Sequence, residues 1–437
     1  MKKRGWYMFF VSLYIGLVIC LAYLFVTQLS TMVTASPASA TAPEIPQASN
    51  YKILTWNDLG MHCYNSDFSD LAVLPPYNTI WAQVILAGNP PTLVTSGIEV
   101  TYVFTDNTYS VGKSNFWTYA QQLFGLDNPL PDNIGLKGKG LSGMMDLAGD
   151  HFVAEGIPLT EYSDSAPTTR SPYQLAQITV KDSASQAVLA QTVVVAPVST
   201  EMHCDNCHSD TGDATTAGGI TPTGKVEMNI LTLHDKLELA NYPAGHTVAL
   251  MDRRPVLCAE CHASNALGAA GVAGVKSLSN AMHNRHAGLA DITPDSDGCY
   301  NCHPGPVTQC LRDVMSQEEG MTCVDCHGEM SRVAQNQNPW LNEPRCDTCH
   351  GFFAFQNQAL YRHSTGHGNL YCEGCHDSTH AIATSREPKD ALKFIALQGH
   401  AGTLSECAVC HTSIPSGEFP HVVVLYNNKQ YLPLQRR

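Results

Sequence analysis

Basic residues are scarce in this chain. It has 25 Lys and Arg against 39 Asp and Glu, which gives a formal net charge of −14 at pH 7. A surface this acidic argues against nucleic acid as a partner and favours cationic or metal-bearing partners, although it says nothing about the fold.

Cysteine and histidine are nearly absent between Tyr51 and Ser199, where only His62, Cys63 and His151 occur. Short apolar or alternating runs fill this part of the chain, separated by clusters of Asn, Pro, Gly, Asp and Ser, as is typical of a β-sandwich or barrel. The expected strands span residues 51–56, 81–86, 97–104, 173–180 and 188–196, and residues 181–187 are expected to close a hairpin. About 150 residues can bury a core of their own. We therefore predict a β-sandwich domain over residues 51–199, with an immunoglobulin-like fold as one form of it.

The N-terminus resembles a targeting segment. Lys2, Lys3 and Arg4 precede an apolar run over residues 6–26, and small residues follow up to Ala40. This order predicts a signal peptide over residues 1–40, with cleavage after Ala40. The apolar run is also long enough to span a bilayer, so retention as a membrane anchor is the alternative. Either way, we expect an exported protein of the periplasm or cell surface, associated with a membrane only if this segment is retained.

The region from residue 204 to residue 411 contains the pentapeptide Cys-x-x-Cys-His seven times. The paired cysteines are Cys204 and Cys207, Cys258 and Cys261, Cys299 and Cys302, Cys323 and Cys326, Cys346 and Cys349, Cys372 and Cys375, and Cys407 and Cys410. The motif histidines are His208, His262, His303, His327, His350, His376 and His411.

This spacing is the attachment site of a c-type haem, whose iron takes the motif histidine as its proximal ligand. Zinc sites also use paired cysteines, but zinc would not require a histidine after every second cysteine. A disulfide framework explains neither that histidine nor the short loops. We therefore predict seven covalently bound haem c groups. The segment from residue 200 to residue 437 is predicted to be a heptahaem domain of short helices and loops, with the haems as its core.

An electron-transfer haem needs a sixth ligand, most often histidine or methionine. Twelve histidines lie outside the motifs, and none of them falls between His303 and His363, so the fourth and fifth haems must take ligands from remote sequence. The favoured distal ligands are His234, His246, His283, His286, His367, His380 and His400, with His203 and His363 in reserve. Met202, Met228 and Met282 are possible substitutes.

A separate cluster of Asp58, Met61, His62, Cys63 and Tyr64 lies at the start of the β-region. The first interpretation is a disulfide between Cys63 and Cys310, the other unpaired cysteine of the mature chain. The alternatives are that His62 ligates a haem, or that the cluster binds copper or another transition metal.

The sequence resembles the multihaem c-type cytochromes of anaerobic, metal-respiring bacteria. The resemblance covers most of the mature chain, and it is carried by Trp56-Asn-Asp-Leu-Gly-Met-His-Cys63, by Ala196-Pro-Val-Ser-Thr-Glu-Met-His-Cys204 and by blocks around Cys258, His283 and Cys372. It implies respiratory electron transfer outside the cytoplasm and is consistent with His283 and His367 as ligands. It supplies no substrate.

The leading interpretation is an electron carrier that works between redox partner proteins, such as other cytochromes or a quinol-oxidising membrane protein. The second is a reductase or oxidase of a small nitrogen or sulfur compound, with one open iron. The chain lacks the Cys-x-x-Cys-Lys motif of pentahaem nitrite reductases, and we assign no catalytic residue. The third is a subunit of a conductive filament, formed by self-association, in which a histidine such as His203 or His421 ligates a haem of the neighbouring subunit.

Overall fold

The computed structural model describes residues 49–289, 296–335, 344–351 and 356–416. The expected signal segment and His421 lie outside these residues. Within these four ranges, no helix is both long enough and apolar enough to cross a membrane.

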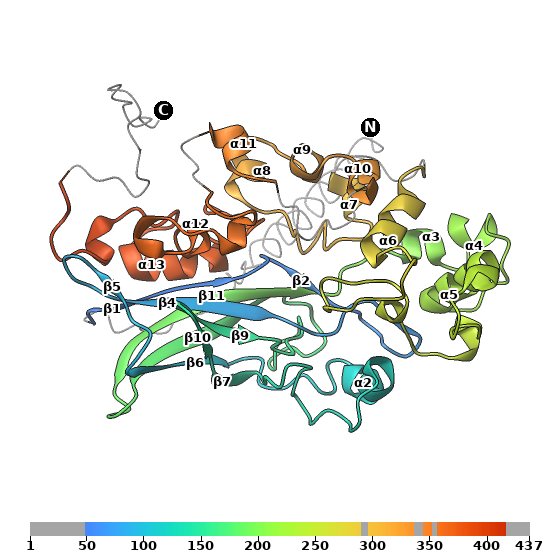
Figure 1. Ribbon diagram of the computed structural model, residues 1–437, viewed down its shortest axis with the longest axis horizontal. Coiled ribbons are helices and arrows are strands. Elements are labelled where there is room, and N and C mark those ends of the chain that lie inside the picture. Colours follow the sequence, from blue (N-terminus) through green and yellow to red (C-terminus); the bar gives the residue numbers. More distant parts are fainter. Residues whose placement is uncertain (1–48, 290–295, 336–343, 352–355, 417–437) are drawn as a thin grey trace, which may run out of the picture. The chain divides into compact units, whose positions relative to one another are not determined.

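The N-terminal part of the chain forms two five-stranded β-sheets (Figure 1). The first has the strand order β1-β4-β9-β8, with β5 paired to β4, and the second has the order β2-β11-β10-β6-β7. The strands of the first sheet are β1 (Tyr51–Asn57), β4 (Thr79–Leu86), β5 (Thr92–Leu93), β8 (Asp146–Ala148) and β9 (His151–Glu155). Those of the second are β2 (His62–Cys63), β6 (Ile98–Phe104), β7 (Ser142–Met144), β10 (Tyr173–Asp182) and β11 (Val188–Ser199). The five predicted strands are confirmed as β1, β4, β6, β10 and β11, and β10 pairs with β11 in the predicted antiparallel hairpin.

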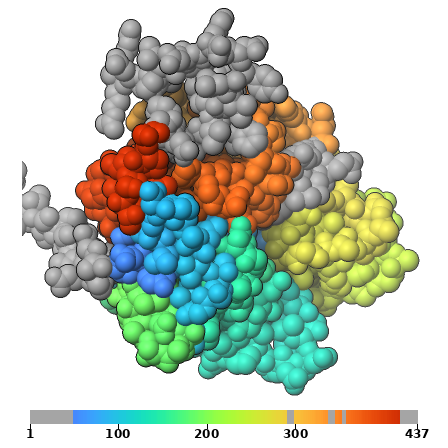
Figure 2. All heavy atoms as spheres, turned by 60° about the vertical axis from the view of Figure 1, so that its left-hand side comes forward, coloured from blue at the N-terminus to red at the C-terminus, as the bar shows by residue number. Residues whose placement is uncertain are grey.

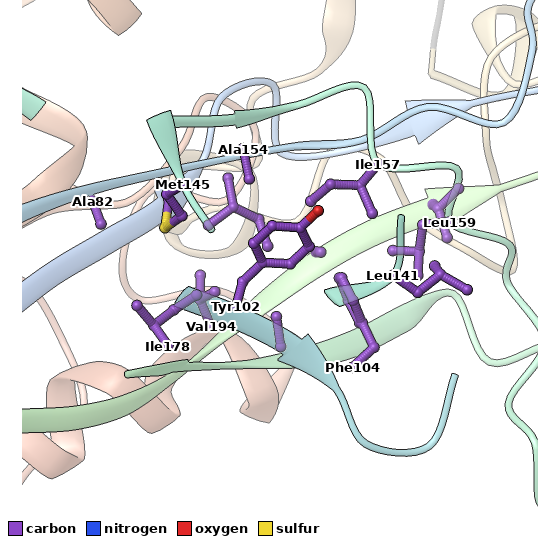
Figure 3. Close-up of a cluster of buried hydrophobic side chains, with 14 of the residues drawn as sticks. Ala82, Tyr102, Phe104, Leu141, Met145, Ala154, Ile157, Leu159, Ile178 and Val194 are labelled. Carbon is purple, nitrogen blue, oxygen red and sulfur yellow. The ribbon is translucent and has the colours of Figure 1, made fainter. Parts of the chain in front are cut away.

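One apolar core is built from side chains of both sheets. Along β6 the alternate residues Val100, Tyr102 and Phe104 are each 1% exposed, because successive strand residues point to opposite faces. Figure 3 shows Tyr102 lying among residues of other strands, including Ala154 of β9 and Val194 of β11. The β-region therefore has a side-chain core that needs no cofactor.

Strand β1 is buried on both of its faces. Ile53 belongs to the core of the β-region, whereas Leu54 and Trp56 lie on the opposite face and pack in a cluster with Cys375 and Cys410. In Figure 2 the C-terminal residues, coloured orange to red, lie directly against the first strands, coloured blue. The outer face of the first sheet is thus covered by the sixth and seventh Cys-x-x-Cys-His motifs.

Beyond residue 204 the described chain folds into short helices and 3-10 turns, which confirms the mixed architecture predicted from the sequence. The helices are α3 (Asp205–His208), α4 (Asp213–Thr216), α5 (Val226–Glu238), α6 (Leu278–His286), α7 (Ser296–Cys299), α8 (Val314–Glu318), α9 (Cys323–His327), α10 (Met330–Gln335), α11 (Asp347–His350), α12 (Cys372–His376) and α13 (Leu392–Gln398). The 3-10 turns are η1 (Leu239–Asn241), η2 (Leu250–Asp252), η3 (Cys258–Glu260), η6 (Tyr361–His363), η7 (His367–Asn369), η8 (Pro388–Ala391) and η9 (Cys407–Val409).

Several short strands and one helix were not predicted, and two of these elements connect to other parts of the fold. Helix α2 (Phe116–Phe124) lies inside the β-region and buries Phe116, Ala120 and Leu123 against its core. Strand β12 (Val256–Leu257), next to the second motif, pairs in parallel with β3 (Leu71–Ala72) of the β-region. The two parts of the chain are therefore joined by backbone pairing as well as by side-chain packing.

Candidate metal centres

Each Cys-x-x-Cys-His motif folds into a tight turn or a short helix. The backbone N–H of the motif histidine donates to the carbonyl of the first cysteine, at 2.8 Å from His208 to Cys204 and 3.1 Å from His262 to Cys258. Residues separated by three or four positions lie on one side of such a turn. Both thiols and the imidazole are therefore presented together, as covalent attachment of a porphyrin requires.

Among the residues that the structure describes, ring contacts pair five of the motif histidines with a histidine from outside the motifs. The distances between ring centres are 6.4 Å for His208 and His286, 6.3 Å for His262 and His234, 6.1 Å for His303 and His283, 6.1 Å for His327 and His380, and 5.9 Å for His411 and His367. All five outside histidines belong to the distal set predicted from the sequence.

The spacing of these pairs suits a shared metal ion. With metal–nitrogen bonds of about 2.0–2.1 Å, as in zinc sites, two imidazoles on opposite sides of one ion have ring centres roughly 6 Å apart. Rings in direct stacking contact lie closer, as Trp81 and His151 do at 4.2 Å. The pairs are therefore separated by the interval that an iron between the two rings would fill.

Hydrogen bonds at Nδ1 orient several of these rings. The Nδ1 of His283 lies 2.8 Å from the carbonyl of Ser279, and that of His286 lies 2.7 Å from the carbonyl of Met282. These two acceptors lie one helical turn before their histidines on α6.

Two more rings are oriented in the same way from other elements. The Nδ1 of His262 lies 2.8 Å from the carbonyl of Lys276, and that of His234 lies 2.9 Å from the Tyr242 hydroxyl. An N–H donated from Nδ1 leaves Nε2 free as a metal ligand. The sequence predicted none of these acceptors, because a carbonyl or hydroxyl beside a histidine has no motif of its own.

Burial keeps several of these imidazoles neutral. It lowers the pKa of His208 and of His303 to about 4, with a further contribution from the neighbouring histidines. Burial, His327 and Arg312 together lower the pKa of His380 to about 3. Neutral imidazole is the form that binds a metal, so these residues are ready to ligate at neutral pH.

The first three motifs are neighbours in space. Asn206 of the first motif donates to the side chain of Asn301 in the third at 2.8 Å. Helix α5 links the second motif to the first. It packs against α3 of the first motif, and its His234 pairs with His262 of the second. Asn229 of α5 also donates to the carbonyl of His208 at 2.9 Å.

The remaining motifs continue this series. Besides burial, His283 and His327 lower the pKa of His303, which links the third motif to the fourth. Burial raises the pKa of Cys326 in the fourth motif, and several acidic neighbours raise it further. One of these neighbours is Cys349, which links the fourth motif to the fifth.

Effects of neighbouring cysteines on pKa values also link the fifth motif to the sixth and the sixth to the seventh. Burial and then Cys346 of the fifth motif raise the pKa of Cys372 to about 11. Burial and then Cys410 of the seventh motif raise the pKa of Cys375 to about 12. The seven motifs therefore form a continuous series of neighbours across the described chain.

The other predicted ligands have different surroundings. The Nδ1 of His246 lies 3.3 Å from Glu260, and the Nε2 of His400 lies 3.5 Å from Glu406. His203 contacts the carbonyl of Gly305 at 3.0 Å, and the ring of His363 lies 5.9 Å from that of Trp81. The sixth ligands of the fifth and sixth motifs thus stay predictions, as do His246 and His400.

Cys63 of the N-terminal cluster lies near Cys310, which in turn is a neighbour of Cys323 in the fourth motif. The Nε2 of His62 is 2.8 Å from Asp58, and its ring stacks with Tyr77. Cys63 and Cys310 are free thiols; burial raises the pKa of Cys310 to about 12, and the nearby Cys63 adds to that rise. The predicted disulfide stays a prediction. Within the described ranges, no group of three or more His, Cys, Asp or Glu side chains could hold a metal ion.

Comparison with protein-family models, with curated proteins and with solved structures found no match for this chain. The function is therefore inferred from the geometry of the motifs and of the histidines paired with them.

Proposed function

We propose that this protein is an exported multihaem c-type cytochrome that carries electrons between redox partners in anaerobic or extracellular respiration. The observation that supports it best is the set of five histidine pairs with ring centres 5.9–6.4 Å apart. Each pair joins a motif histidine, whose two cysteines would attach a porphyrin, to a distant histidine suited to the sixth position. The haem iron would supply the one-electron redox chemistry.

The chain's own residues would hold and tune these groups. The paired cysteines would attach each porphyrin, and each of the five histidine pairs would hold an iron from both sides, which would favour electron transfer over substrate binding. The acceptors at Nδ1 increase the basicity of the ligands. Because neighbouring motifs form a continuous series, electrons could pass along the chain without leaving it.

The finer features of the fold belong to the same proposal. We regard the two N-terminal sheets as a sandwich, and the porphyrins as the packing core of the region beyond residue 200. The clustering of Leu54 and Trp56 with Cys375 and Cys410 makes the outer face of the first sheet one wall of that region. The β-region would then support the sixth and seventh haems directly.

Electron paramagnetic resonance of the ferric protein tests the carrier function. Low-spin signals that account for all bound iron support the carrier. A high-spin component that binds nitrite, hydroxylamine or cyanide would contradict it and favour a reductase or oxidase.

A matched pair of variants tests the ligand assignment that supports the proposal. His380→Met should raise the midpoint potential of one haem and shift one low-spin signal, because a thioether ligand favours ferrous iron. His151→Met should change neither, since His151 is outside the predicted distal set and its ring stacks on Trp81 at 4.2 Å. An unchanged His380→Met protein would remove this ligand and weaken the pairing argument.

A further inference from the structure

His380 is held in an unusual backbone conformation. Its φ is 66°, in the left-handed region that residues other than glycine rarely occupy. The backbone N–H of Arg312 donates to its carbonyl at 2.9 Å, and the guanidinium of Arg312 is fixed by Asp390 at 2.8 Å. Such conformations persist where the surrounding structure enforces them, often at functional sites. The ring of His380 is thereby directed to His327, at 6.1 Å between centres.

The acceptor at the Nδ1 of His380 differs from those at other distal histidines. His234, His283 and His286 each have an oxygen acceptor within 2.9 Å. The Nδ1 of His380 instead lies 3.7 Å from the Sγ of Cys310. A thiol sulfur is a weak acceptor, whereas carbonyl and hydroxyl oxygens are strong ones.

We propose that Cys310 is a positioning residue that sets the redox potential of the fourth haem through the axial ligand His380. This inference rests on the proposed function, because it requires iron between His327 and His380. A strong acceptor at Nδ1 would increase the electron donation of the imidazole and favour ferric iron. Because the sulfur of Cys310 is a weak acceptor, it increases the electron donation of His380 much less. The fourth haem therefore has a higher redox potential than it would have with an oxygen acceptor at the Nδ1.

The fourth motif lies between the third and the fifth, so the redox potential of its haem would affect electron transfer between them. Burial, His327 and Arg312 lower the pKa of His380, and His303 of the third motif lowers it further. His380 is therefore also a neighbour of the third motif. Cys326 of the fourth motif is a neighbour of Cys349 of the fifth. A change at Cys310 would therefore alter an intermediate step of electron transfer rather than an end of the chain.

Two small substitutions test the proposal. Cys310→Ala removes the acceptor and should shift one midpoint potential upward, whereas Cys310→Ser supplies an oxygen and should shift the same potential downward. Spectroelectrochemical titration of the full haem-loaded protein measures both, and magnetic resonance should show one altered low-spin signal with the others unchanged.

Cys63→Ser is the matched control, because Cys63 lies near Cys310 and is likewise outside the seven motifs, while the contact described at the Nδ1 of His380 is made by Cys310. It should leave every potential unchanged. Equal shifts in Cys63→Ser and Cys310→Ser would overturn the inference and point to a bond between the two sulfurs. Unchanged potentials in both Cys310 variants at full haem content would also overturn it. Failure of the unmodified protein to carry haem would instead refute the proposed function.

Discussion

The imidazole rings of His283 and His303 lie 6.1 Å apart between centres, with their planes inclined by only 23°. The pairs at the first and second motifs have nearly perpendicular planes, at 72° and 81°. Ligand orientation decides how far two of the iron d orbitals are split in energy. Parallel planes split them widely, and perpendicular planes leave them nearly equal.

The angles between ring planes therefore predict distinct magnetic resonance signals. The third haem should give an ordinary rhombic low-spin signal, and the first and second should give strongly anisotropic ones. Low-temperature spectra of the ferric protein measure this directly. Seven identical rhombic signals would contradict the ring orientations described for these pairs.

His234 and His246 form a matched pair of substitutions. His234 pairs with His262, whereas His246 lies beside Glu260. His234→Ala should convert one low-spin haem to a high-spin form that binds carbon monoxide when reduced, and His246→Ala should not. The Soret and visible spectra under carbon monoxide report the difference. The opposite pattern would assign the second haem to His246.

Helix α6 contains two of the proposed ligands, His283 and His286, so its N-terminus should affect two haems at once. The Ser277 side chain accepts a hydrogen bond from the N–H of Asn280, and loss of such a cap costs about 0.5–2 kcal/mol. Ser277→Ala should therefore weaken ligation by both His283 and His286, and both low-spin signals should be lost at lower temperature. Ser277→Asp, which keeps a capping oxygen, should restore them. An effect on only one haem would argue against a shared helix.

Glu201 gives the protein a specific sensitivity to acid. Burial would raise the pKa of Glu201, but hydrogen bonds from Thr308 and Val307 outweigh it and hold the pKa below 4.5. Since the folded-state pKa is depressed, the stabilisation is present above the unfolded value of 4.5 and is lost as the pH falls through the folded value.

Replacement of this carboxylate tests that dependence. Glu201→Gln should lower the free energy of unfolding at pH 7 by about 1–3 kcal/mol, with the difference shrinking below pH 4.5. Denaturant titrations at pH 7 and below pH 4.5 measure the difference in the free energy of unfolding. Glu319→Gln, at an exposed position, is the control. A loss of stability that does not depend on pH would show that the charge is not responsible.

The sequence predicted the strands and the motifs because both leave local patterns. Alternating residues identify β6, and paired cysteines with a following histidine identify each attachment turn. The short strand β9 (His151–Glu155) and helix α2 (Phe116–Phe124) carry too few residues for a recognisable period. They were missed for that reason.

The pairing of ligands could not be derived from sequence. His246 lies beside Glu260 and His400 beside Glu406, so for both the role of distal ligand stays a prediction. His380 pairs with His327, a partner set by the packing of remote segments. Nothing in the sequence indicated that Cys310 would lie at the Nδ1 of that ligand.

The intact mass of the purified protein, recorded together with its visible spectrum, tests the central claim most directly. The account predicts a Soret band and a mass greater than that of the processed polypeptide by seven haem groups. A mass equal to the bare polypeptide, with no Soret band, would contradict it.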